Sequence, residues 1–279
     1  LLSEIRAFIN DVYIPDVQAL ASLFPQYYSV GTGCGNLLAY GVFDLNANGT
    51  GKLLARGRYT DGQYAAVDTA AITEYVKHSK FSSTSGRLNP SVGVTVPAPS
   101  KRAAYSWIKA PRYLDKPHEV GPLARMWVNG DYRHGISALD RIAARALEAK
   151  KIADAMDGWL NQLVVGAPVY VRSRIPASAV GVGLSEAPRG ALGHWLQISG
   201  SKISRYQIVT PTGWNASPRD DLEIHGPIEQ ALIGTEVADR DQPIEVLRVV
   251  HSFDPCLSCA VHMVRPGKAA TTVFTGHRH

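Results

Sequence analysis

The longest regular apolar pattern in the chain runs from Ser137 to Val165, and any fold must accommodate it as one long helix. Apolar residues recur there every three or four positions, which is the spacing that places side chains on one face of an α-helix. Ser137 has a side chain that can cap the first turn, and Asp140 adds a negative charge where the helix dipole favours one. We therefore predict a long amphipathic helix packed against a core.

Shorter patterns predict further helices and a few short strands around this helix. Residues 2–24 have helical apolar spacing, but Pro15 should interrupt or bend the segment because it lacks a backbone N–H. Segments rich in glycine and serine predict turns, hairpins and loops. The predicted fold class is α+β and mainly helical, with a helical core and short β hairpins. We predict the remaining helices over 68–76, 222–232 and 243–250, paired strands over 195–198 and 203–210, and a close approach of backbone to a ligand within 181–200.

Composition and charge exclude several classes of protein. The chain has 279 residues, of which 45% are hydrophobic, and that is enough for a substantial core in one or two domains. The formal net charge of +5 is spread along the chain without basic runs, so we predict no nucleic-acid partner. No stretch approaches the roughly 20 apolar residues of a membrane span, and the charged first residues do not resemble a signal peptide. We expect neither element in this chain.

The strongest chemical signal is the set Cys256, Cys259 and His262, which follow one another at intervals of three residues. Thiolates and imidazole together select soft or borderline metals such as nickel, zinc and iron. Asp254 could orient this loop through hydrogen bonds. The spacing alone predicts a metal site with zinc as the default metal, and it disfavours a redox C-x-x-C because no βαβ pattern surrounds the motif. The third cysteine, Cys34, is interpreted as a small buried hydrophobic residue.

Residues 251–262, with the sequence HSFDPCLSCAVH, resemble the C-terminal D-P-C-x-x-C-x-x-H signature of [NiFe]-hydrogenase large subunits. Four upstream segments resemble the central motifs of the same family in the same order, and residues 36–41 also fit. Several motifs in order are more specific than one C-x-x-C. The four segments are YSWIKAPR at 105–112, EVGPLAR at 119–125, EAPRG at 186–190 and TGWNASPRD at 212–220.

The resemblance implies a Ni–Fe site. Cys256 matches a terminal thiolate ligand of nickel, and Cys259 matches a thiolate that bridges nickel to an iron carrying CO and cyanide. Arg189 matches the arginine whose guanidinium lies over the open side of the metal pair, where it acts as, or assists, the base that splits H2. Asp254 matches the acid that pairs with this arginine. The implied activity is the reversible oxidation of H2 to protons and electrons.

The resemblance also implies the surroundings of that site. Ala187 and Pro188 would line the pocket for the diatomic ligands. Val209 occupies a position where some members carry a hydroxyl that donates to a cyanide, and a valine side chain cannot make that hydrogen bond. His262 and the backbone carbonyl of Ile208 match ligands of a nearby Mg²⁺, a hard ion that prefers oxygen and needs a further carboxylate from the N-terminal half.

The family's N-terminal R-x-C-G-x-C motif has no counterpart in this sequence, so two of the four thiolates must come from elsewhere. We interpret residues 1–262 as one domain, the C-terminal half of a large subunit, and residues 263–279 as the peptide that a maturation protease removes. The implied partners are an iron–sulfur small subunit, the N-terminal half of the large subunit, the maturation endopeptidase, nickel-insertion factors and H2. The small subunit would place the protein at a membrane, with the cytoplasm as the alternative.

Two other functions stay open. One is a non-catalytic homologue related to the quinone-binding subunit of respiratory complex I, although such relatives lack the nickel thiolates. The other is a binding module stabilised by zinc. Single residues also have structural interpretations: Arg112 and Arg125 as buried ion-pair partners, Glu119 as the acid that pairs with one of them, and His194 as a packed core residue.

Overall fold

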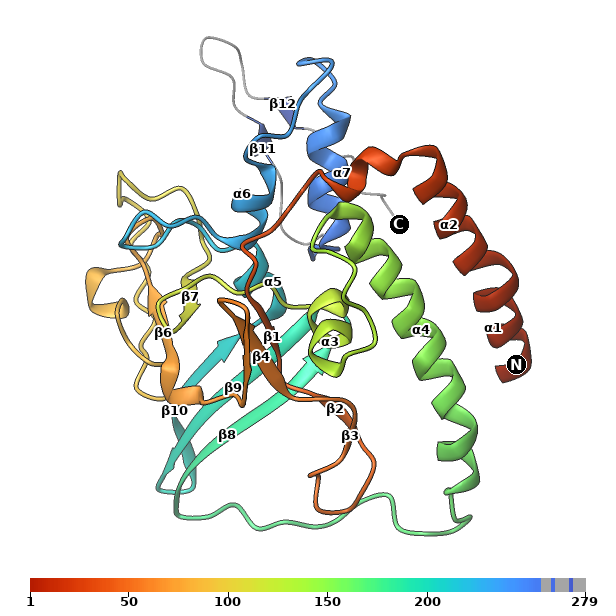
Figure 1. The fold of residues 1–279 in the computed structure, drawn as a ribbon. Helices are drawn as coiled ribbons and strands as arrows, with labels where there is room; N and C mark the ends of the chain where they lie inside the picture. Colours follow the sequence, from red (N-terminus) through yellow and green to blue (C-terminus); the bar gives the residue numbers. More distant parts are fainter. Residues whose placement is uncertain (257–261, 264–270, 273–279) are drawn as a thin grey trace.

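The computed structural model describes residues 1–256, 262–263 and 271–272, and it combines helices with several small antiparallel sheets (Figure 1). This is the α+β class that the sequence predicts. The helices are α1 (Leu2–Phe8), α2 (Ile14–Leu23), α3 (Pro122–Asn129), α4 (Ala138–Asn161), α5 (Pro211–Asn215), α6 (Pro227–Leu232) and α7 (Ile244–Ser252). The strands are β1 (Leu37–Ala39), β2 (Val42–Asp44), β3 (Lys52–Leu54), β4 (Gly57–Thr60), β5 (Gln63–Ala65), β6 (Ile72–Tyr75), β7 (Ala110–Tyr113), β8 (Ser178–Ala187), β9 (Gly190–Ser199), β10 (Lys202–Val209), β11 (His262–Met263) and β12 (Thr271–Thr272).

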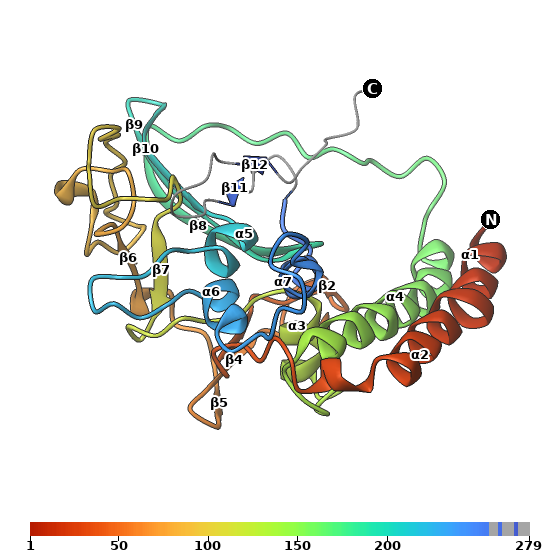
Figure 2. The same ribbon diagram turned by 90° about the horizontal axis from the view of Figure 1, so that it is seen from above.

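The first helices form one long N-terminal arm, residues 2–23, that packs along α4 (Figures 1 and 2). A π-helical turn over Ile9–Tyr13 joins α1 to α2, and Pro15 stands in the first turn of α2. The predicted interruption therefore takes the form of a wider turn just before the proline. Arg6 fastens the arm to α4, because its guanidinium donates to the carbonyls of Ala153 and Asp154 at 3.1 and 2.8 Å.

The long predicted helix is α4. The Ser137 hydroxyl accepts a hydrogen bond from the backbone N–H of Asp140 at 3.2 Å, which confirms the predicted N-cap. The helix ends at Asn161, four residues before the predicted end. One side of α4 packs on the arm, and another side packs on α3 around Met126 and Ala144. The helix is therefore central to the fold and not a surface helix.

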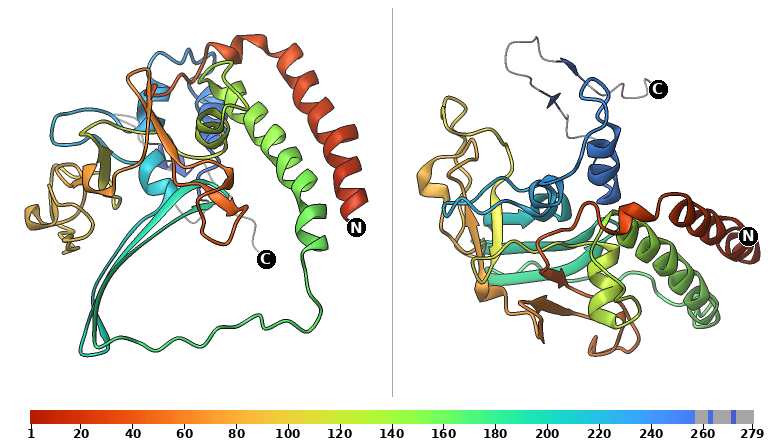
Figure 3. Two further views of the ribbon diagram at one scale, coloured as in Figure 1. Left: turned by 60° about the horizontal axis from the view of Figure 1, so that its bottom comes forward. Right: turned by 45° about the horizontal axis from the view of Figure 1, so that its top comes forward.

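The largest sheet has the order β10-β9-β8, and its antiparallel strands form a long curved hairpin with a third strand (Figure 3). The predicted strand pair lies within β9 and β10 and is confirmed. Strand β8 has no clear sequence signal, because Gly181 and Gly183 interrupt its apolar residues. The pairing of β8 with β9 ends at Ala187↔Gly190, so Pro188 and Arg189 form the turn of the hairpin.

The main hydrophobic core lies under the end of this sheet nearest the turn. Trp195 and Val209 from the sheet pack with Trp214 of α5. The same cluster includes residues of β1, β6 and β7, so it joins segments between Leu38 and Trp214. Its buried members are Leu38, Tyr40, Ile72, Tyr113, Val120, Ala191, Trp195, Val209 and Trp214.

Three of the predictions for single segments are wrong. Residues 68–76 form a 3₁₀ turn followed by β6, because Ile72 to Tyr75 pair with β7 and such residues favour strands. The helix predicted over 222–232 begins only at Pro227, because the Asp220 carboxylate accepts the N–H groups of the preceding loop. His194 is not packed in the core: its Nδ1 lies 2.6 Å from the Tyr206 hydroxyl on an exposed side of the sheet. The helix predicted over 243–250 is present as α7.

None of the helices in the described residues is both long enough and apolar enough to cross a membrane.

Replacing the N-cap of α4 should destabilise the protein. We expect Ser137→Ala to lower the free energy of unfolding by about 1 kcal/mol, since the N–H of Asp140 loses its acceptor. Ser22→Ala is the matched control, because the exposed Ser22 hydroxyl only donates to the Gln18 carbonyl within α2. Urea denaturation of both variants would measure the difference, and equal midpoints would contradict the capping role.

Candidate functional site

Arg189, Asp254 and Cys256 lie together where the hairpin turn meets the C-terminal end of α7. The Arg189 Nε donates to the backbone carbonyl of Asp254 at 2.7 Å, and Nη2 lies 3.4 Å from the Asp254 carboxylate. Cys256 follows two residues later, and its backbone N–H donates to the Thr212 hydroxyl at 3.3 Å. The structure thus brings Arg189 into contact with Asp254, 65 positions away in sequence, and Cys256 follows Asp254 by two residues.

Two arginines of α4 hold the end of α7 in place. Arg141 donates to the Ser252 hydroxyl at 3.4 Å and lies 3.6 Å from the centre of the Phe253 ring. Arg145 donates to the Ser252 carbonyl at 2.9 Å. Asp254 then turns the chain out of the helix with a φ of +50°, a left-handed conformation that aspartate tolerates better than most residues. These contacts direct residues 254–256 toward the hairpin turn.

The hairpin turn itself is fixed by two glycines whose backbones cross. Gly190 follows Arg189 and has a φ of +133°, and a Cβ atom there would lie 2.6 Å from the backbone nitrogen of Gly121. Gly121 has a φ of +127°, and its own Cβ would meet the Arg189 carbonyl at 3.2 Å. Only glycine fits this crossing. The close approach found within 181–200 is thus between two backbones of this chain, and the predicted approach to a ligand stays a prediction.

The Arg125 guanidinium ties the residues before Arg189 to the helical core. Its side chain is 4% exposed, and it donates to both carboxylate oxygens of Glu148 and to Glu186. It also donates to the carbonyls of Ala187 and Pro188, each at 3.0 Å. All five N–H groups of the guanidinium are therefore used. Arg125 fixes the two residues that precede Arg189 in the turn.

A second set of contacts fastens the segment 212–220. The Asn215 side chain accepts from the N–H of Val120 at 3.0 Å and donates to its carbonyl at 2.9 Å. Arg112 is fully buried and donates to the Asp220 carboxylate at 2.7 Å and to the Ser217 hydroxyl at 3.0 Å. The predicted burial of Arg112 and Arg125 in ion pairs is thus confirmed.

Glu119 pairs with neither of these arginines. Both of its carboxylate oxygens accept hydrogen bonds at 2.8 Å from Arg141, so the predicted partner of Glu119 is wrong. The reason is spatial, because Arg141 projects from α4 toward the loop at Gly31, whose carbonyl it also binds at 2.7 Å. Sequence spacing did not indicate this contact.

The other predicted site residues that the structure describes lie in the hairpin turn, in the main core and on the sheet. Ala187 and Pro188 lie beside Arg189 in the hairpin, and Val209 is 3% exposed in the main core. Ile208 lies on the sheet with 45% of its surface exposed. Cys259 lies outside the described residues, and of His262 only the backbone is described, in β11. Thr212 contacts Cys256 but was not singled out, although it lies in the TGWNASPRD segment.

Cys34 has the character of a structural residue. Its Sγ donates to the carbonyls of Pro117 and Asn36 at 3.3 and 3.5 Å, and burial raises the pKa of the thiol to about 11. A neutral, buried thiol is not a good metal ligand. Among the described residues, no group of three or more His, Cys, Asp or Glu side chains could hold a metal ion. Cys256 is the one described cysteine at the site, and its sulfur chemistry fits nickel or iron.

Comparison with known proteins identifies the family of this arrangement. A family model described as nickel-dependent hydrogenase matches residues 1–136 and 128–262. The chain belongs to the nickel-dependent hydrogenase family.

Two relatives in this family show how far the similarity extends. The periplasmic [NiFeSe] hydrogenase large subunit of Desulfomicrobium baculatum is 43% identical over 94% of this chain and 56% of its own length. The uptake hydrogenase large subunit of Rhizobium leguminosarum is 34% identical over 95% of this chain. A solved structure of the Desulfomicrobium [NiFeSe] hydrogenase superposes with a TM-score of 0.88 and 44% identity over 94% of this chain and 58% of that chain.

The chain therefore spans a little over half the length of the hydrogenase large subunits that it matches. The fold prediction is confirmed by these matches. Neither alternative function, a relative of the quinone-binding subunit of complex I or a zinc-stabilised module, gains support from them.

The crossing of Gly121 and Gly190 gives one prediction for the stability of the chain. Gly190→Ala should destabilise the hairpin turn by several kcal/mol, because backbone atoms at 2.6 to 2.9 Å cannot move aside cheaply and the positive φ adds strain. Gly181→Ala is the matched control, since nothing lies within 4 Å of a Cβ placed there on the same strand pair. Thermal unfolding of both variants would show the difference, and equal melting temperatures would contradict the argument.

Glu186 gives a prediction about pH. Burial raises the pKa of its carboxyl to about 7, although Arg125 opposes the shift. The unfolded chain loses this proton near the ordinary pKa of about 4.3, so it binds fewer protons than the folded chain between about pH 5 and 7. The free energy of unfolding should therefore fall as pH rises through this range. We expect Glu186→Gln to reduce that fall by about 3 kcal/mol in denaturation measured from pH 5 to 8. If the free energy of unfolding changed equally with pH in the two proteins, the role of Glu186 would be contradicted.

Proposed function

We propose that this chain forms the C-terminal part of the large subunit of a [NiFe]-type hydrogenase and contributes half of the site that interconverts H2 with protons and electrons. The observation that carries this proposal is the contact of the Arg189 guanidinium with Asp254, two residues before Cys256, in a chain of the nickel-dependent hydrogenase family. These two segments lie far apart in sequence. We take residues 1–262 as one domain of that subunit.

Cys256 and Cys259 are proposed as two thiolate ligands of a Ni–Fe centre. Thiolates suit nickel and iron, and two further thiolates would come from the part of the large subunit that carries the family's first cysteine pair. A bound Ni–Fe centre, its iron carrying CO and cyanide, supplies the redox chemistry that cleaves H2. Ala187, Pro188 and Val209 are proposed to line the diatomic ligands, and Thr212 is the hydroxyl nearest to the Cys256 backbone.

Arg189 is proposed to act through its fixed positive charge. A guanidinium stays protonated in proteins, so it stabilises the negative charge of nearby thiolates and orients H2 at the site more readily than it takes a proton. Asp254 holds this side chain through its carbonyl and its carboxylate. His262 and the carbonyl of Ile208 are proposed as ligands of Mg²⁺, which would need further oxygen ligands.

The proposed partners follow from the chemistry of electron transfer. The sequence holds three cysteines, too few for iron–sulfur clusters in addition to nickel ligands, so electrons would leave through an iron–sulfur small subunit. Nickel-insertion factors would load the site, and an endopeptidase would remove residues 263–279. The small subunit would associate the enzyme with a membrane, with a cytoplasmic enzyme as the alternative.

The decisive experiment replaces one cysteine at a time. The chain is coexpressed with the N-terminal half of a large subunit, a small subunit and maturation factors, and nickel content and H2-dependent dye reduction are measured. We expect Cys256→Ser to lose both nickel and activity. Cys34→Ser is the matched control and should keep both, because the Cys34 Sγ is engaged by the backbone carbonyls of Pro117 and Asn36. Full nickel and activity in Cys256→Ser would contradict the proposal.

A substitution at Arg189 separates metal loading from catalysis. Arg189→Lys keeps the charge but cannot contact the Asp254 carbonyl and carboxylate together, so the charge loses its fixed position. We expect nickel content to stay unchanged while the turnover rate falls by roughly 10²-fold, the usual loss for one positioned donor. Arg205→Lys on β10 serves as the control. Unchanged turnover in Arg189→Lys would show that the guanidinium has no part in the reaction.

A further inference from the structure

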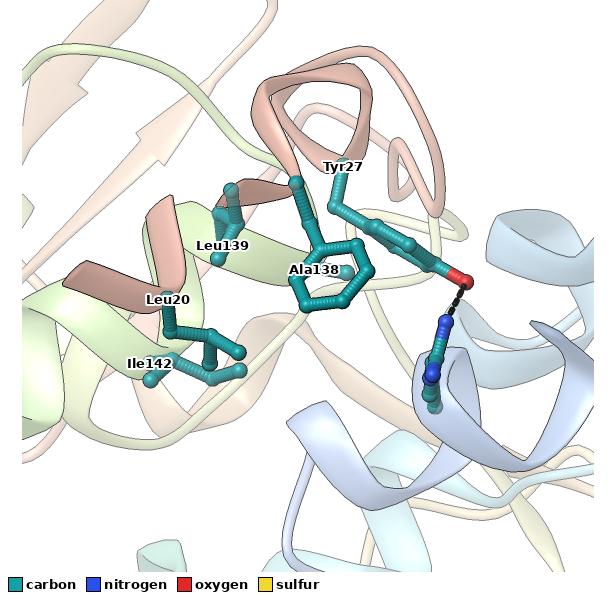
Figure 4. Close-up of a pocket in the computed structure, with 7 residues that line it drawn as sticks. Leu20, Tyr27, Ala138, Leu139 and Ile142 are labelled. Atoms are coloured by element: carbon teal, nitrogen blue, oxygen red, sulfur yellow. Dashed lines mark hydrogen bonds between the residues drawn. The ribbon is translucent and has the colours of Figure 1, made fainter. Parts of the chain in front are cut away.

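A cavity lies where the end of α2 and the 3₁₀ turn Pro25–Tyr28 meet the start of α4 and α7 (Figure 4). It has a volume of about 110 Å³. Apolar side chains form most of its wall, and Tyr27 and Arg248 supply polar groups at one side. Sites for small molecules combine apolar walls with a few placed polar groups, and this cavity has both. Its lining consists of Leu20, Phe24, Tyr27, Ala138, Leu139, Ile142 and Arg248.

The apolar part of the cavity is made by two neighbouring helices. Leu20 comes from α2, and Leu139 and Ile142 come from the first turns of α4 (Figure 4). An apolar cavity of about 150 Å³ takes up benzene, with its six carbon atoms. By that proportion, a cavity of about 110 Å³ has room for about four carbon atoms. A compact, branched isobutyl group has this size.

Arg248 stands on α7 at the other side of the cavity, and two aromatic rings fix the direction of its side chain. Its guanidinium carbon lies 5.2 Å from the centre of the Phe24 ring and 5.4 Å from the centre of the Tyr27 ring. Nη1 also donates to the Tyr27 hydroxyl at 3.0 Å. A guanidinium carries five N–H groups, so most of them stay available for a further acceptor. The Tyr27 hydroxyl, which accepts from Arg248, can still donate its own proton.

The positive charge of Arg248 is not neutralised within the described part of the chain, and its side chain is exposed. Asp140 in α4 is buried and accepts hydrogen bonds from its own neighbours. Asp16 in α2 is exposed to water, and neither it nor Glu245 of α7 forms an ion pair with Arg248 in the described residues. The cavity thus joins an apolar wall to an accessible positive charge, and this combination is complementary to a small carboxylate.

We propose that the cavity binds a short branched-chain carboxylate, with an isobutyl group against Leu20 and Ile142 and the carboxylate on Arg248. The two oxygens of a carboxylate match the parallel N–H groups of a guanidinium, and such bidentate pairs are stronger than single hydrogen bonds. The Tyr27 hydroxyl donates to the same carboxylate. This inference goes beyond the proposed hydrogenase activity, since no residue proposed as a metal ligand takes part. Because α2, α4 and α7 all line the cavity, the bound molecule holds the three helices together.

The test titrates the purified full chain, without nickel, with isovalerate and with its neutral amide, isovaleramide. Isothermal titration calorimetry measures both dissociation constants, and thermal unfolding measures the shift in melting temperature. We expect isovalerate to bind with a dissociation constant in the millimolar range, as suits so small a ligand, and to raise the melting temperature. Isovaleramide should bind at least about tenfold more weakly, because it cannot accept a bidentate pair from a guanidinium.

Two variants test the charged and the apolar part of the site separately. Arg248→Gln should weaken isovalerate binding about tenfold and remove the preference over the amide, with Arg240→Gln in the exposed loop before α7 as the matched control. Leu20→Trp should fill the cavity and abolish binding, while the melting temperature of the chain alone stays level or rises. Leu23→Trp is its matched control on the same helix, because Leu23 is 73% exposed and lies outside the cavity lining.

Several results would overturn the proposal. The absence of saturable isovalerate binding is one, and undiminished binding by Leu20→Trp is another. Equal binding of acid and amide that Leu20→Trp abolishes would assign the cavity to a neutral apolar molecule instead. If Leu20→Trp fails to fold, Arg248→Gln decides, since its exposed side chain can be shortened without loss of packing. Isovalerate binding equal in Arg248→Gln and Arg240→Gln would then overturn the contact with the guanidinium.

Discussion

The guanidinium of Arg125 is the interaction on which the candidate site depends. It is buried, and each of its N–H groups has an acceptor: Glu148 in α4, Glu186 in β8, and the carbonyls of Ala187 and Pro188. Removing one member of such a buried cluster typically costs about 3 to 5 kcal/mol, because the remaining charges stay without partners. Arg125 thus joins the central helix to the hairpin turn that presents Arg189. Hydrogen bonds are directional whereas apolar burial is not, so these contacts fix the direction of the turn.

Arg125 is one of three buried arginines around the site that each bind a carboxylate and join two segments of the chain. Arg112 joins β7 to the loop at Asp220, Arg125 joins α3 to the hairpin, and Arg141 joins α4 to Glu119 and to the end of α7. Burying charges is expensive compared with packing apolar side chains, so such clusters are weak contributors to stability. We infer that they are retained for geometry, because each one holds two loop segments at a defined distance. Most residues of these clusters lie in the segments that resemble hydrogenase motifs.

How far the sequence predicts the structure depends on whether a feature is local. The helix α4 and its cap at Ser137 follow from spacing and capping within one segment, and both are present. Strand β6 was predicted as a helix because its pairing with β7 is some 40 residues away and overrides local preference. Glu119 was assigned the wrong arginine for the same reason. Pairing across the fold has no signal in the spacing of a single sequence.

At the candidate site, too, the sequence predicts some features and misses others. Family motifs pointed to Arg189, Asp254 and Cys256, and the structure places them together. Val209 is predicted to lie beside diatomic ligands, and this stays a prediction. Its side chain packs in the core with Trp195 and Trp214, and the hydroxyl that accepts from the Cys256 N–H belongs to Thr212. A motif does not by itself give the direction of each side chain, because neighbouring residues of a strand point to opposite faces of a sheet.

The helix α4 connects the candidate site with the N-terminal arm. Arg141, Arg145 and Glu148 project from one part of it toward α7 and the hairpin, whereas the carbonyls of Ala153 and Asp154, one to three turns further on, bind Arg6 of the arm. The same helix therefore carries the contacts of the arm and those of the guanidinium clusters. Because protein interiors are closely packed, side chains on one helix keep fixed positions relative to one another. The packing of the arm and the geometry around Arg189 are thus both set by the position of α4.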